Sequence, residues 1–265
     1  MQDAYTIQPV PWDSRFFGFP VGNIQLPDHF SQARLKDALA QVAGQFRLVY
    51  VNVAEEGPDE LEELAVPTKC YDRKVVFERD VPAQVADVDP HIQAHTDMTC
   101  PRRLEMLAVQ SGTFSRFLKD PKLSPYYERL FLTWVNQSVS GQTADAIWVW
   151  VADDDTKAGL ITTRLFKGVD PETGKPTKEG RIGLLSVDQA YRGRGAAFAL
   201  MGACDYWAHS LDVPKLSLST QKENDVVMRL CQKCGYTQVT ELTTYHYWTP
   251  GWKYSPHQGW HLRGQ

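Results

Sequence analysis

Residues 186–201 read SVDQAYRGRGAAFALM, and this stretch decides the fold. The residues at 182–188, IGLLSVD, are typical of a buried strand, and the apolar residues that follow the turn predict a helix near 196–211. The turn between them alternates basic residues with glycines: Arg192, Gly193, Arg194 and Gly195. A strand that runs straight into a helix through a glycine-rich turn predicts an α/β protein with a mixed sheet.

The same turn suits an anion. The first N–H groups of a helix have no intrahelical acceptor and lie at the positive end of its dipole, and glycine lets such a backbone approach a phosphate closely. Pyrophosphate binding at Arg192–Ala197 is therefore one interpretation, and a solvated basic loop is the other. The three-glycine spacing of a dinucleotide-binding fold and the Gly-Lys-Ser/Thr of a Walker A loop are both absent from the sequence.

The rest of the chain supplies alternating strand and helix patterns. Strands are predicted at 45–53, 74–79, 146–152, 158–166, 182–188, 215–221 and 242–249, and helices at 32–44, 58–66, 104–139 with a break near 119–125, 196–211 and 225–234. The stretch 81–99 lacks periodicity and is interpreted as a linker, and the polar loop 167–181 is expected to be exposed. We therefore predict an N-terminal α/β domain (1–100), a second domain (101–249) and a tail (250–265).

Composition narrows the class of protein. The 265 residues carry 28 Lys and Arg against 32 Asp and Glu, a net charge of -4 that argues against nucleic-acid binding. No apolar run reaches the roughly 18 residues of a membrane span, and the N-terminus lacks the pattern of a signal peptide. Five irregularly spaced cysteines indicate a reducing compartment rather than a disulfide framework. We expect a cytoplasmic globular protein without a membrane or nucleic-acid partner.

Two motifs in order carry a family resemblance. Arg192-x-x-Gly195-x-Ala197 resembles the GNAT signature Q/R-x-x-G-x-G/A, and the segment from Asn224 to Tyr236 resembles the second GNAT motif, N-x-x-A-x-x-L-Y-x-K-x-G-F. The resemblance implies a GNAT fold with a mixed sheet, a smaller N-terminal α/β domain, and acyl-CoA as co-substrate with no metal. It assigns CoA contacts to the turn and its surroundings: Leu185, Ser186, Val187, Arg192, Gly193, Arg194, Gly195, Ala196, Ala197 and Asn224.

A narrower resemblance covers residues 10–248. WDSRFFG at 12–18, SRF at 115–117, GRIGLL at 180–185 and YHYW at 245–248 are similar to segments of the bacterial dTDP-fucosamine acetyltransferases. This resemblance implies transfer of an acetyl or larger acyl group to the amine of a dTDP-linked 3- or 4-amino-dideoxy sugar, for surface polysaccharide. A homodimer is among the assemblies it allows. The rival hypotheses are a GNAT enzyme for another amine (a protein N-terminus, an antibiotic or a polyamine) and a non-catalytic acyl-CoA sensor.

The catalytic chemistry expected of the fold is direct transfer, in which the amine attacks the thioester carbonyl and CoA thiolate leaves. A backbone N–H near Leu185–Val187 would hold the oxygen that becomes negative. Cys231 occupies the position of the family's tyrosine, which protonates the thiolate. A thiol can donate a proton, but a buried cysteine more often only packs. Cys231-x-x-Cys234 also matches half of a metal or redox site, without a second ligand pair at suitable spacing.

Candidates for the acceptor side each have two interpretations. Arg116 would bind the diphosphate of the sugar nucleotide, or else cap a helix or pair with a carboxylate. Trp12, Phe16 and Phe17 would stack on the thymine ring, or else form core. His246 alternates with Tyr245 and Tyr247 along the last strand, so that it faces the opposite side. We expect one of these sides to contact the acceptor, with His246 or Tyr247 as an acid–base group and Tyr245 as a binding group.

Overall fold

The computed structural model describes residues 5–26, 32–54, 68–169 and 173–251, and it divides the chain into two compact units. The N-terminal unit comprises 1–70 and 244–265, and the larger unit comprises 71–243. The chain passes between the units inside two long strands, β4 (Thr68–Asp80) and β10 (Thr237–Trp248). The boundaries of these two units differ from the predicted domain boundaries near residues 100 and 249. The predicted division into domains stays a prediction. The predicted helix 58–66 and most of the predicted tail lie outside the described residues.

The N-terminal unit is a small α/β layer. Its elements are β1 (Thr6–Pro9), α1 (Pro11–Phe17), β2 (Val21–Gln25), α2 (Gln32–Val42) and β3 (Leu48–Ala54). Strand β2 pairs antiparallel with β1 and parallel with β3, and the end of β10 lies next to β3. Helix α2 is amphipathic, with Leu35, Ala38, Leu39 and Val42 on its buried side. This side packs on the sheet around Val49 and Val51, which forms the core of the unit.

Seven strands contribute to the sheet of the larger unit. Besides β4 and β10 they are β5 (Ile92–Ala94), β6 (Ala146–Val151), β7 (Lys157–Val169), β8 (Pro176–Val187) and β9 (Lys215–Gln221). The order is β10-β4-β9-β8-β7-β6-β5, and β8 and β9 are parallel. The mixed sheet predicted from the strand–turn–helix pattern is confirmed.

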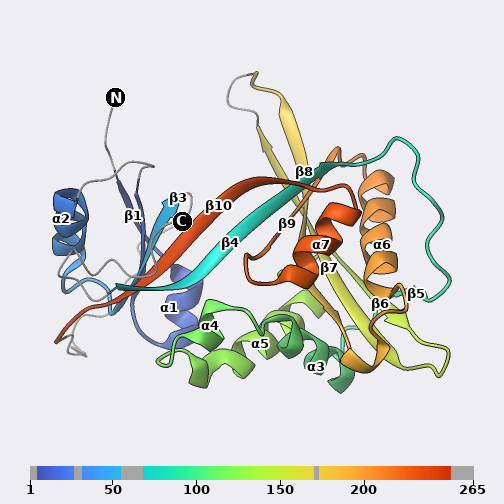
Figure 1. Cartoon of the computed structure of the whole chain (residues 1–265), viewed down its shortest axis with the longest axis horizontal. Helices are drawn as coiled ribbons and strands as arrows, with labels where there is room; N and C mark the ends of the chain where they lie inside the picture. The colour runs from blue at the N-terminus through green and yellow to red at the C-terminus, as the bar shows by residue number, and fades with distance from the viewer. Residues whose placement is uncertain (1–4, 27–31, 55–67, 170–172, 252–265) are drawn as a thin grey trace. The chain divides into compact units, whose positions relative to one another are not determined.

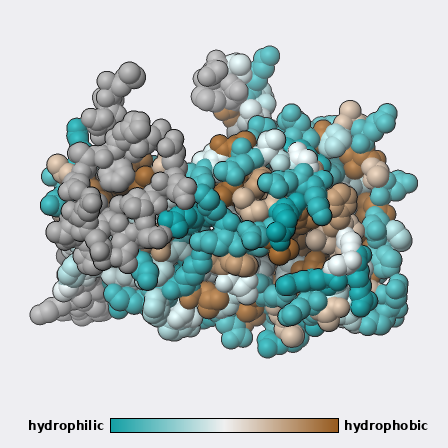
Figure 2. Space-filling model, in the orientation of Figure 1, coloured by the Kyte–Doolittle hydropathy of each residue, from teal (hydrophilic) through white to brown (hydrophobic). Residues whose placement is uncertain are grey.

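Helices flank this sheet. Helices α6 (Ala196–Ser210) and α7 (Asp225–Lys233) share one hydrophobic cluster with the strands. Figure 1 shows α3 (Arg102–Ser111), α4 (Arg116–Lys119) and α5 (Tyr127–Val139) grouped together, away from α6. Short 3-10 turns at Ser124–Tyr126 and Gln189–Tyr191 precede α5 and α6. On the visible face of the larger unit, hydrophobic residues are scattered among hydrophilic ones (Figure 2).

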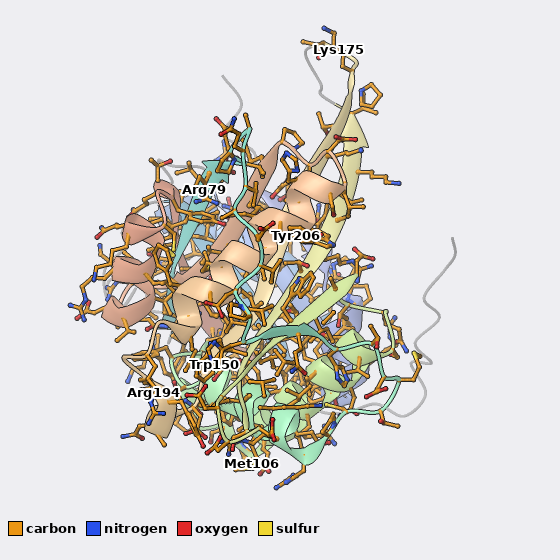
Figure 3. All side chains as sticks on the ribbon, turned by 90° about the vertical axis from the view of Figure 1, so that its right-hand side faces the viewer. Arg79, Met106, Trp150, Lys175, Arg194 and Tyr206 are labelled. Carbon is orange, nitrogen blue, oxygen red and sulfur yellow. The ribbon has the colours of Figure 1, made fainter. Side chains whose placement is uncertain are left out.

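Three segments differ from the sequence-based expectations. Strand 74–79, predicted in the N-terminal domain, pairs antiparallel with β9 in the larger unit. The predicted linker 81–99 contains β5, which pairs with β6. The predicted loop 167–181 is mostly the end of the β7–β8 hairpin, whose register runs out to Val169 and Pro176, with Lys175 near the tip (Figure 3). In each case pairing with a distant or adjacent strand overrides a weak local preference.

Candidate active site

The parallel strands β8 and β9 separate partway along their length. Among the described residues they pair at three positions, from Gly180 with Leu216 to Ile182 with Leu218. Beyond this point β8 continues to Val187 and β9 to Gln221 without further pairing in that register. Because a strand edge without a neighbouring strand offers its backbone groups to a ligand, the opened edge can bind an extended chain.

A β-bulge in β8 lies at the start of this opening. The register with β7 moves from Ile161–Leu185 to Thr163–Ile182, which inserts one extra residue into β8. The Leu184 N–H donates to Thr162 Oγ1 at 2.9 Å. A Cβ on Gly183 would lie 2.9 Å from that same oxygen, so the close approach at the bulge favours glycine.

The bulge sets the direction of the backbone groups that follow. The N–H groups of Leu184 and Asp188 point toward β7, where Asp188 donates to Ala158 O at 2.8 Å. Since N–H groups alternate along a strand, those of Leu185 and Val187 point toward the opened edge. The Val187 carbonyl lies on this side too, where it accepts from Gln110 Nε2 at 2.9 Å. These are the N–H groups that the sequence analysis predicted for the thioester oxygen.

A cavity of about 310 Å³ occupies the opening. Its apolar part comes from Leu184 and Leu185 on β8, Leu218 on β9, and Phe131 and Trp134 on α5. Its polar part comes from β4, β9, α4 and the start of α7, including Asp72, Ser115, Arg116, Thr220 and Asn224. One space in the larger unit therefore joins the opened strand edge to a group of polar side chains.

Asp72 and Arg116 form the charged end of this cavity, which we call the charged pair. Asp72 Oδ2 lies 3.8 Å from Arg116 Nη1, and Asp72 is only 5% exposed. The guanidinium of Arg116 also lies 4.8 Å from the centre of the Phe117 ring. Burial raises the pKa of Asp72 above its usual value, although Arg116, Lys74 and Lys119 each act to lower it. Arg116 therefore pairs with a carboxylate, as its structural interpretation predicted. It also lines the cavity, which its interpretation as a substrate-binding residue requires.

Helix α7 begins at the edge of the cavity. Asn224 caps it by accepting from Val227 N–H, and its amide donates to Thr220 Oγ1 at 3.2 Å. Cys231 lies one turn beyond Val227 and is fully buried in the hydrophobic cluster between α6 and α7. Burial raises the pKa of its thiol to about 12. Its side chain is not among those that line the cavity, which favours the packing interpretation.

The glycine turn lies where β8 leads into α6. Gly193 (φ 78°) and Gly195 (φ 82°) both adopt the left-handed conformation, and Gly195 is the N-cap of the helix. A Cβ at either position would meet no atom within 4 Å, so the surface beside the turn is open. The first intrahelical bond runs from Ala199 N–H to Gly195 O, which leaves the N–H groups of Ala196–Phe198 for another acceptor. Figure 3 shows Arg194 at this end of α6. These residues fit a pyrophosphate.

The remaining predicted residues lie in the N-terminal unit. Trp12 and Phe16 stack with ring centroids 5.2 Å apart on α1, and Phe17 is buried. Tyr245 is fully buried in the core under α2, and Tyr247 packs against that core.

His246 faces the other side of β10, as the alternation predicts, with its ring 5.1 Å from the ring of Tyr50. Tyr50 in turn donates to Asp13 Oδ2 at 2.6 Å. The structure describes these side chains within their own unit, and their contact with an acceptor stays a prediction.

The sequence analysis did not identify Asp72. Its only signal is an acidic residue just before the predicted strand 74–79, and its proximity to Arg116 depends on the fold. Within the described residues there is no group of three or more side chains suited to hold a metal ion, and no helix long and apolar enough to cross a membrane.

A family model matches part of the larger unit. Residues 107–236 match the acetyltransferase (GNAT) family. No curated protein matches the chain in sequence. The match indicates acyl-CoA-dependent N-acyltransferase activity for this region, with acetyl-CoA or another acyl-CoA as donor.

Solved structures share the fold at low identity. A GCN5-related N-acetyltransferase from Kribbella flavida has a TM-score of 0.51 and 11% identity, over 88% of this chain and 82% of that one. A functionally unknown conserved protein from Staphylococcus epidermidis has a TM-score of 0.51 and 13% identity, over 85% and 84%. A tandem GNAT protein from the clavulanic acid biosynthesis pathway has a TM-score of 0.51 and 14% identity, over 86% and 75%.

Proposed function

We propose, starting from the GNAT-superfamily domain at residues 107–236, that this protein transfers an acyl group from acyl-CoA to the amine of a dTDP-linked 3- or 4-amino-dideoxy sugar. The donor is acetyl-CoA or a larger acyl-CoA such as a hydroxybutyryl thioester. The nucleotide sugar rests on the WDSRFFG, SRF, GRIGLL and YHYW segments of the sequence.

The donor side of the proposal rests on the opened edge and the glycine turn. The pyrophosphate of CoA would bind the free N–H groups at the start of α6, where Gly195 admits a close approach. The pantetheine chain would extend between β8 and β9, and its thioester oxygen would accept from Leu185 or Val187 N–H. Such donors stabilise the negative charge that develops on this oxygen in the transition state.

The observation that carries the acceptor side is the position of Arg116 in the wall of the cavity, with two lysines near the same carboxylate. Arg116, Lys74 and Lys119 all act on the single carboxylate of Asp72. Burial and Arg116 lower the pKa of Lys74, which is the expected response of one cation close to another. Lys119 is itself paired with Glu223 at 3.3 Å, so Arg116 is the cation that lines the cavity. Its guanidinium can bind phosphate oxygens in a bidentate manner, which supports an acceptor that carries phosphate.

Product analysis tests the proposal. Several acyl-CoAs would be mixed with dTDP-amino sugars and with control amines (a peptide N-terminus, an aminoglycoside and a polyamine), and the products identified by mass spectrometry. We expect acylated dTDP-sugars. Acylation of a control amine alone would favour the rival enzyme, and acyl-CoA binding without any product would favour the non-catalytic sensor.

A further inference from the structure

We propose that Asp72 receives the ammonium group of the acceptor and removes its proton before the amine attacks the thioester. This inference rests on the proposed N-acyl transfer but not on the identity of the sugar. Nothing in the sequence motifs assigns Asp72 a role, because the strand that carries it precedes the GNAT-matched residues 107–236.

Asp72 lines the same cavity as Leu184 and Leu185, which follow the bulge at the opened edge of β8. Because the Leu185 N–H is a proposed donor to the thioester oxygen, an amine that attacks the thioester would enter the cavity that Asp72 also lines. Arg116 Nη1 lies 3.8 Å from Asp72 Oδ2, so the carboxylate is held at a fixed place in the wall of this cavity.

An amine reaches the enzyme largely as an ammonium ion, and the cations nearby oppose its entry. Arg116 and Lys119 on α4 and Lys74 on β4 act on Asp72, and Gln221 on β9 adds a side-chain hydrogen bond. Lys119 is also paired with Glu223 at 3.3 Å, so Arg116 and Lys74 are the nearby cations that the Glu223 carboxylate does not offset. Asp72 is the one carboxylate among the residues that line this cavity, so it is the group to which an ammonium would bind. Once bound, the ammonium lies close to the cations, which lower its pKa and favour loss of its proton.

Burial raises the pKa of Asp72. A carboxylate with a raised pKa is a stronger base than an exposed aspartate, so its proton affinity is closer to that of the amine.

The reaction then balances as follows. Asp72 takes one proton from the ammonium, and the neutral amine forms a C–N bond with the thioester carbon. The C–S bond breaks as the oxyanion collapses, and the second proton on nitrogen passes through water to the departing thiolate. The products are the amide and neutral CoA thiol, and Asp72 returns its proton to solvent.

The test is the pH dependence of kcat/KM for an amine that the parent enzyme acylates. Asp72→Asn keeps the shape of the side chain but cannot accept the proton. At pH values below the pKa of the acceptor amine, we expect kcat/KM to fall by about 10²-fold or more, a usual contribution of general base catalysis. The loss should shrink about tenfold for each pH unit gained up to the amine pKa, because only amine that is already neutral reacts in the variant.

Two further variants separate catalysis from structure. Asp72→Glu retains a carboxylate and should restore the parental shape of the pH profile at a lower rate. Asp205→Asn is the control: Asp205 and Arg79 form another partly buried ion pair of the larger unit, and neither residue lines this cavity. This variant should lower the melting temperature and leave the pH profile unchanged.

A parental pH profile in Asp72→Asn, with a uniform loss or no loss of rate, would overturn the role of Asp72 while leaving the proposed function intact. A failure of the parent enzyme to acylate any amine would instead overturn the proposed function, and this inference with it. Calorimetric binding of CoA to each variant confirms that the donor side is intact.

Discussion

Replacement of Cys231 by alanine tests whether the thiol donates a proton to departing CoA. The side chain is fully buried among apolar residues of α6 and α7 and does not line the cavity. Removal of one buried heavy atom costs roughly 1–2 kcal/mol, from lost transfer free energy and a small void. For a unit of this size we expect the melting temperature to fall by about 2–8 °C.

Turnover should stay within about threefold of the parent, since general acid catalysis by Cys231 would instead account for about 10²-fold or more. The assay is steady-state formation of CoA thiol with the amine that product analysis identifies. Cys234→Ala is the matched control, because Cys234 lies at the end of the same helix, is 8% exposed and belongs to the same hydrophobic cluster.

A kcat that collapses in Cys231→Ala at unchanged KM, while Cys234→Ala remains active, would refute the packing interpretation. Cys231→Tyr gives a second comparison. A phenol placed in this filled core should cost about 1–3 kcal/mol through overpacking. A Tyr variant that is as stable as the parent and turns over faster would show that the position is open to the thioester after all.

Three other predictions follow from the site. Gly195→Val and its control Gly141→Val each place a valine where the backbone has a left-handed φ in an open position, so each should lose roughly 1–2 kcal/mol of stability. Only Gly195→Val should also weaken CoA binding, by at least about tenfold in calorimetry. Equal CoA affinity in the two variants would remove the turn from the site. Arg116→Ala should raise KM for the dTDP-sugar about ten- to hundredfold while the affinity for CoA stays nearly constant. Arg194→Ala should weaken CoA binding and leave KM for the dTDP-sugar nearly constant. A loss of affinity for both ligands in Arg116→Ala would indicate a structural role. The pKa of Cys231 is raised to about 12 in the folded protein, so this thiol ionises at a lower pH in the unfolded chain. The free energy of unfolding should therefore fall as pH rises from about 9 toward 12, by at most about 1.4 kcal/mol per pH unit for this group. In circular dichroism melts, Cys231→Ala should show a shallower fall than the parent.

The local patterns of the sequence predicted much of the larger unit. The strand 215–221 and the helix 225–234 agree with β9 and α7 within one residue, because both have strong periodicity and clear ends. The turn at Arg192–Gly195 was visible in the sequence because glycine and a helix start are local features, and both glycines adopt left-handed φ values. Anion binding at this turn stays a prediction. The alternation of Tyr245, His246 and Tyr247 also followed from the period of a strand.

Only the tertiary structure decided what depends on contacts between distant segments. The fold brings Asp72 on β4 beside Arg116 on α4, 44 positions away in the sequence, and no local pattern specifies that pair. The same holds for Cys231, whose motif position suggested an acid but whose burial depends on how α7 packs against α6 and the sheet. The opening between β8 and β9 likewise has no signature of its own, because both strands are individually regular and only their register shows where they part. Periodicity fixes which face of an element is buried, whereas the cavity and its charges arise from how the elements are packed together.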